Sequence, residues 1–209
     1  MPSPLSLRLP GRTTPVRRWQ PLSDAEWAAL APHLARAEGA PGRPLPEARA
    51  RMDAIFWVAA AGCPWSALPP RRGRPDTVGR HFRRLAHAGV WEALLRALAD
   101  PRCPAPLRAV EHYLVRAARR ATRLRGLRIV MLAKRLGLPS ALRGPGWMLP
   151  DTDLSELASA YVEHLLAPLY EGRWEANTPA LRRSLSLVRR GLMRLAGGCA
   201  RIPRCLEPA

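Results

Sequence analysis

The residues best suited to recognising a polyanion cluster between positions 71 and 84. Arginine can donate paired hydrogen bonds to a phosphate or to a guanine edge, which lysine cannot do. A helix that begins near Asp76 would carry its arginines outward, and the preceding arginine-rich loop would lie beside phosphates. The candidate DNA-binding residues are Arg71, Arg72, Arg74, Thr77, Arg80, His81, Arg83 and Arg84. The alternative interpretation is a solvated basic face on a helix that packs into the core.

The overall charge also favours an anionic partner. The chain of 209 residues carries a formal net charge of +18, and its pI is about 11.6. Because each neutralised phosphate releases a counterion, double-stranded DNA is the expected partner. An anionic membrane surface is the competing partner. Only one of the 34 basic residues, Lys134, is lysine; a GC-rich genome would give the same bias, so this ratio decides nothing.

Residue patterns for metal binding or nucleophilic catalysis are not found. The four cysteines form no Cys-x2-Cys pair, no histidine pair has zinc-finger spacing, and no serine or cysteine nucleophile motif occurs. We therefore expect no metal ion and no cofactor. Isolated thiols in a chain without an apolar signal region favour a cytoplasmic, nucleoid-associated location. No run approaches the ~18 apolar residues of a membrane span.

The apolar periodicity predicts an all-α fold. Ser23 and Glu26 form a capping box at the start of the first helix. A second helix is expected over about 47–61, with Gly62 as its end. Asp76 is the expected N-cap of the arginine-rich helix.

Four further helical segments are expected after residue 100. Segments 105–123 and 127–137 lie in a region, 101–143, with eleven basic residues and one acid, a net charge of +10. Segments 153–170 and 181–195 show strong amphipathic spacing. The expected organisation is a disordered basic arm over 1–20, a small helical bundle with a helix-turn-helix-like module over 21–99, a looser basic helical region of unknown role over 104–196, and an irregular tail over 197–209.

Several strings in residues 21–98 occur in a fixed order. Gly62-Cys-Pro-Trp65 and Leu68-Pro69 are followed by Thr77-Val78, an arginine-rich helix and Gly89-Val-Trp91. Upstream lie Leu22-Ser-Asp-Ala-Glu-Trp27, Gly42-Arg-Pro44, Arg49 and Asp53-Ala-Ile-Phe-Trp-Val58. Together they resemble the N-terminal helical domain of insertion-sequence transposases of the IS-four/IS-five type. The resemblance implies a helix-turn-helix-like module that binds the ends of a mobile element, and it adds Arg43 to the candidate DNA-binding residues.

Three departures from the family pattern bear on sequence recognition more than on the fold. Ser66 stands where the family usually has arginine, and residues 72–75 replace a loop that often contains an aromatic residue. Gly79 falls inside the proposed recognition helix, where it costs about 1 kcal/mol relative to alanine.

The resemblance also implies which residues and which fold catalysis would require. Strand cutting in this family uses two aspartates and a glutamate on a ribonuclease-H-like α/β fold, where they hold two metal ions. Residues 101–209 show no period-two, β-branched run. Asp151 and Asp153 follow a short apolar segment, but Pro150 argues against a central strand and an N-cap explains the aspartates better. We therefore expect a truncated or split transposase half that is not an enzyme by itself.

Two alternatives remain open. The chain could be a complete but divergent transposase, or a regulatory protein whose C-terminal helices pair with each other or with another chain. Possible partners other than DNA are a second copy of the chain and a separate catalytic subunit. Residues 133–138 weakly resemble the second helix of a helix-turn-helix, but a helix end with Gly137 as its cap is favoured.

Overall fold

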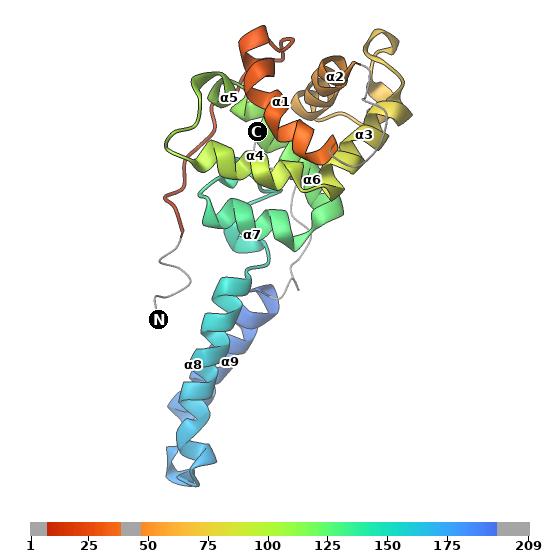
Figure 1. Cartoon of the computed structure of the whole chain (residues 1–209). Coiled ribbons are helices and arrows are strands. Elements are labelled where there is room, and N and C mark those ends of the chain that lie inside the picture. The colour runs from red at the N-terminus through yellow and green to blue at the C-terminus, as the bar shows by residue number, and fades with distance from the viewer. Residues whose placement is uncertain (1–7, 39–46, 196–209) are drawn as a thin grey trace. The chain divides into compact units, whose positions relative to one another are not determined.

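The structure is a computed structural model that describes residues 8–38 and 47–195. These ranges contain helices and no strand, so the all-α prediction is confirmed (Figure 1). The α-helices are α1 (Asp24–Glu38), α2 (Ala48–Ala61), α3 (Pro75–His87), α4 (Val90–Ala99), α5 (Ala105–Ala109), α6 (Glu111–Arg125), α7 (Leu127–Arg135), α8 (Thr152–Tyr170) and α9 (Pro179–Leu195). Short 3-10 turns are η2 (Trp65–Ala67), η3 (Pro70–Arg72), η4 (Pro139–Ala141), η5 (Gly146–Met148) and η6 (Trp174–Ala176).

The chain divides into two compact units at a different place from the expected one. One unit spans Leu9–Arg143, and the other contains, among the described residues, Arg8 and Gly144–Leu195. The expected division between residues 99 and 104 therefore lies inside the first unit. The reason is that α5, α6 and α7 bury their apolar faces against α1–α4 instead of forming a separate region.

Local signals place most helix ends correctly. At the start of α1 the Glu26 carboxylate accepts the Ser23 N–H at 2.8 Å, and the Ser23 hydroxyl accepts the Glu26 N–H at 3.2 Å. This reciprocal pair is the predicted capping box. Gly62 ends α2 with φ of 66°. The prediction for α3 was wrong, because Pro75 occupies the first turn and the extended Arg74 takes the N-cap position instead of Asp76.

Helix α6 lies at the centre of the first unit. It packs against α2, α3, α4 and α7 (Figure 1). The Phe56 and Tyr113 rings meet with centroids 5.6 Å apart, and both side chains are fully buried. The buried face of α6 consists of Glu111, His112, Tyr113, Leu114, Val115, Ala117, Ala118, Ala121 and Thr122. The expected helix over 105–123 is broken near Val110, where α5 ends and α6 begins.

A chain of aromatic rings fixes α3 to its neighbours. Trp65 lies 5.2 Å from Phe82, and Phe82 lies 5.3 Å from Trp91, measured between ring centroids. Gly79 lies under the Trp65 indole, and a Cβ at this position would meet the ring at 3.6 Å. The aromatic string that carries the family resemblance therefore positions α3.

Residues 9–20, which we call the N-terminal strap, cross the first unit in an extended conformation. This differs from the expected disordered arm, because the strap makes backbone and side-chain bonds to the unit. Leu9 N–H donates to the Arg135 carbonyl at 2.8 Å, and Arg12 N–H donates to that of Gly137 at 2.9 Å. The buried Glu111 carboxylate accepts bonds from Arg12 and Thr14, each at 2.7 Å.

The second unit contains a hairpin of α8 and α9. Asp151 caps α8 by accepting the Leu154 N–H at 3.1 Å, as predicted. Asp151 also pairs with Arg8 at 2.6 Å, and Asp153 pairs with the same guanidinium at 3.3 Å. None of the described helices is long and apolar enough to cross a membrane.

Candidate nucleic-acid interface

Helix α3 separates its residues cleanly into a buried and an exposed side. Val78, Phe82 and Leu85 point into the core. The exposed side, which we call the α3 outer face, consists of Asp76, Thr77, Arg80, Arg83, Arg84 and His87. Each of these positions has neighbours three or four residues away in this set, so together they cover one broad side of the helix. The α3 outer face thus presents three arginines, two further polar side chains and one carboxylate, that of Asp76, to solvent.

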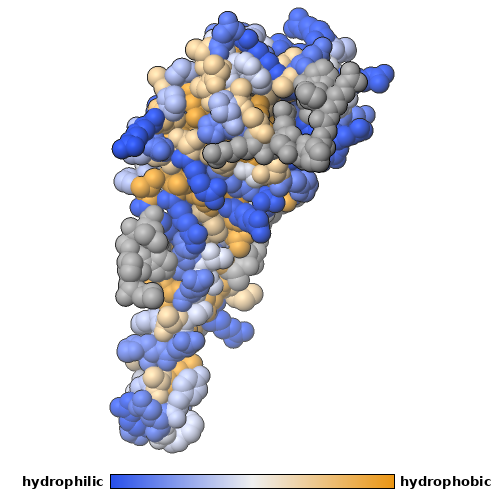
Figure 2. Space-filling model, viewed as in Figure 1, coloured by the Kyte–Doolittle hydropathy of each residue, from blue (hydrophilic) through white to orange (hydrophobic). Residues whose placement is uncertain are grey.

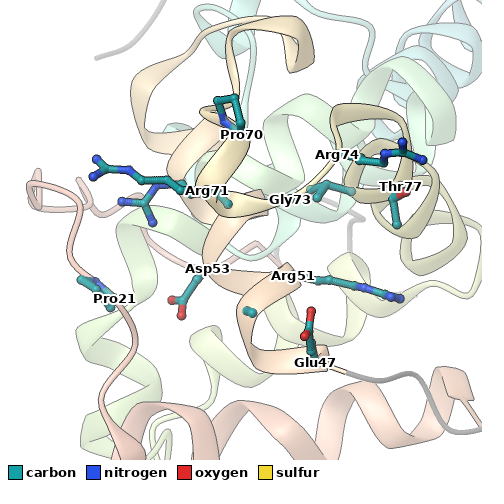
Figure 3. Close-up of a pocket in the computed structure, with 12 residues that line it drawn as sticks. Pro21, Glu47, Arg51, Asp53, Pro70, Arg71, Gly73, Arg74 and Thr77 are labelled. Atoms are coloured by element: carbon teal, nitrogen blue, oxygen red, sulfur yellow. The ribbon is translucent and has the colours of Figure 1, made fainter.

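The loop before α3 forms an open pocket of about 570 Å³ beside this face. Figure 3 shows Arg71 on the loop, Arg74 and Thr77 at the start of α3, and Arg51 reaching across from α2. Arg71, Arg74 and Thr77 are exposed, and Arg51 is half-buried. The loop and the α3 outer face therefore form one basic surface, defined by Arg51, Arg71, Arg74, Thr77, Arg80, Arg83 and Arg84.

Two carboxylates also line this pocket, on the α2 side where Arg51 lies. Asp53 and Glu47 both line it (Figure 3). Burial raises the pKa of Asp53, which accepts the Leu22 N–H at 2.8 Å and so ties the start of α1 to α2. Asp53 therefore has a structural partner, and the basic side of the pocket is the part open to an anion.

The structure contradicts the choice of His81 as a DNA-contacting residue. Its side chain is only 4% exposed, and burial lowers its pKa to about 4, with Arg84 and Arg51 adding to the shift. The imidazole is therefore neutral at pH 7 and lies inside the unit. His81 follows Val78 by three residues and precedes Leu85 by four, a spacing that already indicated the buried side.

Arg72 also differs from its neighbours in the loop. Its guanidinium carbon lies 3.8 Å from the Trp19 ring centroid and 5.9 Å from that of Trp57. Burial, followed by the nearby Arg71, lowers the pKa of Arg72. This stacking on tryptophan fastens the loop to the N-terminal strap. Arg72 therefore holds the loop, while Arg71 and Arg74 remain exposed on it.

Many arginines outside this surface contact the protein itself. Arg116 donates to the Ala59 carbonyl at 2.9 Å, and Arg120 donates to the Cys63 carbonyl at 2.9 Å. Arg120 also stacks on Trp65 at 4.5 Å, and burial lowers its pKa. Arg125 pairs with Glu92 at 2.8 Å. These α6 arginines donate to carbonyl oxygens at the end of α2 and pair with the buried Glu92 carboxylate. Much of the positive charge of 101–143 is therefore structural.

The remaining predicted residues are placed as follows. Arg43 lies outside the described residues. Arg49 pairs with Asp24 at 2.6 Å and so joins α2 to α1. Sequence reasoning missed Arg51; its position four residues after Glu47 was the available signal for a surface location. Between α2 and α3, residues 62–74 form a connection with two 3-10 turns, longer than the roughly 3–4-residue turn of a helix-turn-helix.

Within the described ranges, no carboxylate cluster or metal site provides a second candidate functional site. No group of three or more His, Cys, Asp or Glu residues is placed to hold a metal ion there. Asp151 and Asp153 are engaged with Arg8 and with the start of α8. The basic surface on α3 and its loop is therefore the candidate site.

Comparison with known proteins agrees with the resemblance seen in the sequence. No curated protein and no solved structure matches the chain. One family model does match, and it covers α1, α2, α3 and the first part of α4, while the remainder of the chain is unmatched. Residues 22–95 are similar to the family described as "Putative transposase of IS4/5 family (DUF4096)".

Proposed function

We propose that the Leu9–Arg143 unit binds double-stranded DNA through the basic surface on α3 and the loop before it. The observation that carries this proposal is the outward side of α3, where Arg80, Arg83 and Arg84 stand exposed beside Thr77. A helix of this kind fits the major groove, where arginine reads guanine edges. Arg71 and Arg74 on the adjoining loop would contact phosphates. The family match at residues 22–95 supports the same role.

We further propose that the DNA is the terminal repeat of a mobile element and that this chain does not cut it. The transposase-related segment supports the first part. The second part rests on the engagement of Asp151 and Asp153 with Arg8, which leaves them serving structure instead of metal binding. A separate catalytic subunit would then carry out cleavage.

The test compares two double variants that remove the same charge. Arg80→Ala/Arg83→Ala removes two exposed arginines from the α3 outer face, whereas Arg102→Ala/Arg128→Ala removes two exposed arginines elsewhere on the unit. Affinity for a labelled duplex with the inverted repeats flanking the gene, and for a scrambled duplex, is measured across a salt series.

The α3 variant should lose at least about tenfold in affinity for the repeat duplex and most of the preference for the repeat over the scrambled duplex, because the removed arginines would read base edges. The control variant should lose less than about threefold, because its arginines act only through general charge. Equal losses in both variants would show that charge alone drives binding and would exclude the α3 surface as the site. Equal binding of both duplexes by wild type would exclude recognition of the repeat.

A further inference from the structure

The α8–α9 hairpin leaves its apolar side chains exposed to an unusual extent. From Leu154 to Leu195, no described side chain is buried. Figure 2 shows hydrophobic and hydrophilic residues interleaved over the described surface. The large apolar side chains exposed on the hairpin are Leu157 (43%), Tyr161 (49%), Tyr170 (77%), Trp174 (72%), Leu187 (63%) and Met193 (61%). Two helices alone can cover only the sides that face each other, so a hairpin with this composition requires another layer.

On each helix an exposed leucine has an apolar or small residue at helical spacing. Leu157 and Tyr161 are four residues apart and therefore share one side of α8. On α9, Leu187 lies three residues after Ser184 and four before Gly191. Small residues on either side of a leucine allow a neighbouring helix to approach closely and place a large side chain there.

The two helices carry opposite charge. Helix α8 contains three acidic residues and neither lysine nor arginine, whereas α9 contains five arginines and no acid. Glu156 and Glu163 are exposed and seven residues apart, as are Arg182 and Arg189 on α9. Because seven residues correspond to two helical turns, each pair forms a line along its helix.

We propose that this hairpin is a dimerisation element in which α8 of one chain packs against α9 of a second copy. Such pairing covers the exposed apolar residues and places the acidic helix beside the basic one. The competing arrangement, with α9 against α9, would bring ten arginines together and is opposed by like-charge repulsion. Charge complementarity therefore favours a second copy as the partner. It also favours the pairing of α8 with α9 over the pairing of like helices.

The same pairing defines the symmetry. When each α8 covers the α9 of the other copy in stacked hairpins, the two-fold axis runs parallel to the helices. Adjacent helices in the resulting four-helix bundle are then all antiparallel, which favours their dipoles. Both hairpin tips lie at the same end of the bundle, so Tyr170 and Trp174 of the two copies can cover each other. The inference does not depend on DNA binding.

The first test measures the mass of the full chain in solution without DNA. Wild type should be a dimer at micromolar concentration by light scattering and sedimentation equilibrium. Leu157→Glu/Leu187→Glu should be a monomer, because two charges would be buried in the bundle without partners. The matched control Leu127→Glu changes a leucine of similar exposure (42%) on α7 and should remain a dimer. Circular dichroism verifies that all three remain helical.

The second test uses charge reversal to distinguish this pairing from unspecific association. Arg182→Glu/Arg189→Glu makes the charge lines of both helices acidic, and Glu156→Arg/Glu163→Arg makes both lines basic. Each variant alone should dimerise at least about tenfold more weakly, since like charges would face each other. An equimolar mixture should form a heterodimer, because every contact between copies is again between opposite charges.

The outcomes separate cleanly. A monomeric wild type overturns the proposal, whether or not the chain binds DNA. A dimer that survives Leu157→Glu/Leu187→Glu places the interface elsewhere and also overturns it. Failure of the mixed charge variants to associate excludes the pairing of α8 with α9.

Discussion

On α3, arginine side chains stand in solvent, whereas those on α6 reach carbonyl oxygens of the protein. The difference follows from position, because Arg80 and Arg83 lie opposite the buried side of their helix, while Arg116 and Arg120 face the end of α2. Net charge alone therefore overestimates the number of arginines available to DNA. Replacing an α6 arginine would expose carbonyls that lose their donors, and the consequence would be lower stability.

His81 makes stability depend on pH. Burial holds its pKa at about 4 in the folded protein, against 6.5 for the ordinary side chain. The part of the free energy of unfolding that depends on a neutral His81 is complete above pH 6.5. It is lost as the pH falls from 6.5 toward 4, because the unfolded chain binds a proton that the folded chain excludes. The shift corresponds to about 3 kcal/mol. His112 is also buried with a lowered pKa, caused by burial and by Arg116 and Arg119, and acts in the same direction.

The effect is measured as the free energy of unfolding in urea at several pH values between 7.5 and 4.5. Wild type should lose stability toward acid, and His81→Leu should show a shallower dependence over this range. His112 and the carboxylates still make the free energy of unfolding depend on pH in both proteins. Identical slopes for the two proteins would mean that His81 is protonated in the folded state, contrary to its burial.

At the scale of elements, the N-terminal strap depends on the end of α7. Gly137 has φ of 63° and ends α7 in a Schellman motif, with Leu138 N–H bonded to the Ala133 carbonyl at 2.9 Å. The predicted glycine cap is therefore confirmed. A Cβ on Gly137 would lie 2.2 Å from the Pro10 carbonyl oxygen, a distance that the backbone cannot accommodate without movement.

Gly137→Ala should therefore lower the free energy of unfolding by about 2 kcal/mol or more, through backbone strain and displacement of the strap. Gly79→Ala is the matched control. Its new methyl group would meet Trp65 at an ordinary 3.6 Å, and removing glycine from a helix interior gains about 1 kcal/mol. Thermal melts should show a lower midpoint for the first variant and an equal or higher one for the second. A normal midpoint for Gly137→Ala would show that the strap is not bound at this glycine.

At the scale of the whole molecule, the matched family segment does not contain its entire core. Residues 22–95 supply Phe56, but its aromatic neighbour Tyr113 comes from α6, and the Tyr113 hydroxyl donates to the Arg18 carbonyl of the strap at 2.7 Å. The strap and α6 thus close the core from outside the segment. The unit that should fold is Leu9–Arg143.

A fragment of residues 9–143 should unfold cooperatively, as a domain with a complete core does. A fragment of residues 21–99 should show helical circular dichroism but a broad thermal transition and dye binding, because the core side chains that α6 covers would be exposed. These properties are checked by circular dichroism and fluorescence on both fragments. A sharp transition for 21–99 would show that the segment is self-sufficient and that α6 is an accessory to it.

The sequence by itself determined the helices and most of their ends. Capping boxes, left-handed glycines and apolar spacing act within a few residues, so Ser23, Gly62 and Gly137 could be interpreted without the rest of the chain. The family segment was recognisable for a similar reason, since its aromatic and glycine residues occur at fixed separations. The outward arginines of α3 were predictable from helical spacing alone.

The tertiary structure decided what depends on distant contacts. Arg72 stacks on Trp19, and the buried Glu111 accepts hydrogen bonds from Arg12 and Thr14. The residues of each contact are far apart along the chain. The sequence predicted a disordered arm and a boundary near residue 101 because charge and proline content describe solvation, not packing. Only the packed chain shows that residues 9–20 and α6 complete the core, since burial is a property of all the surrounding segments together.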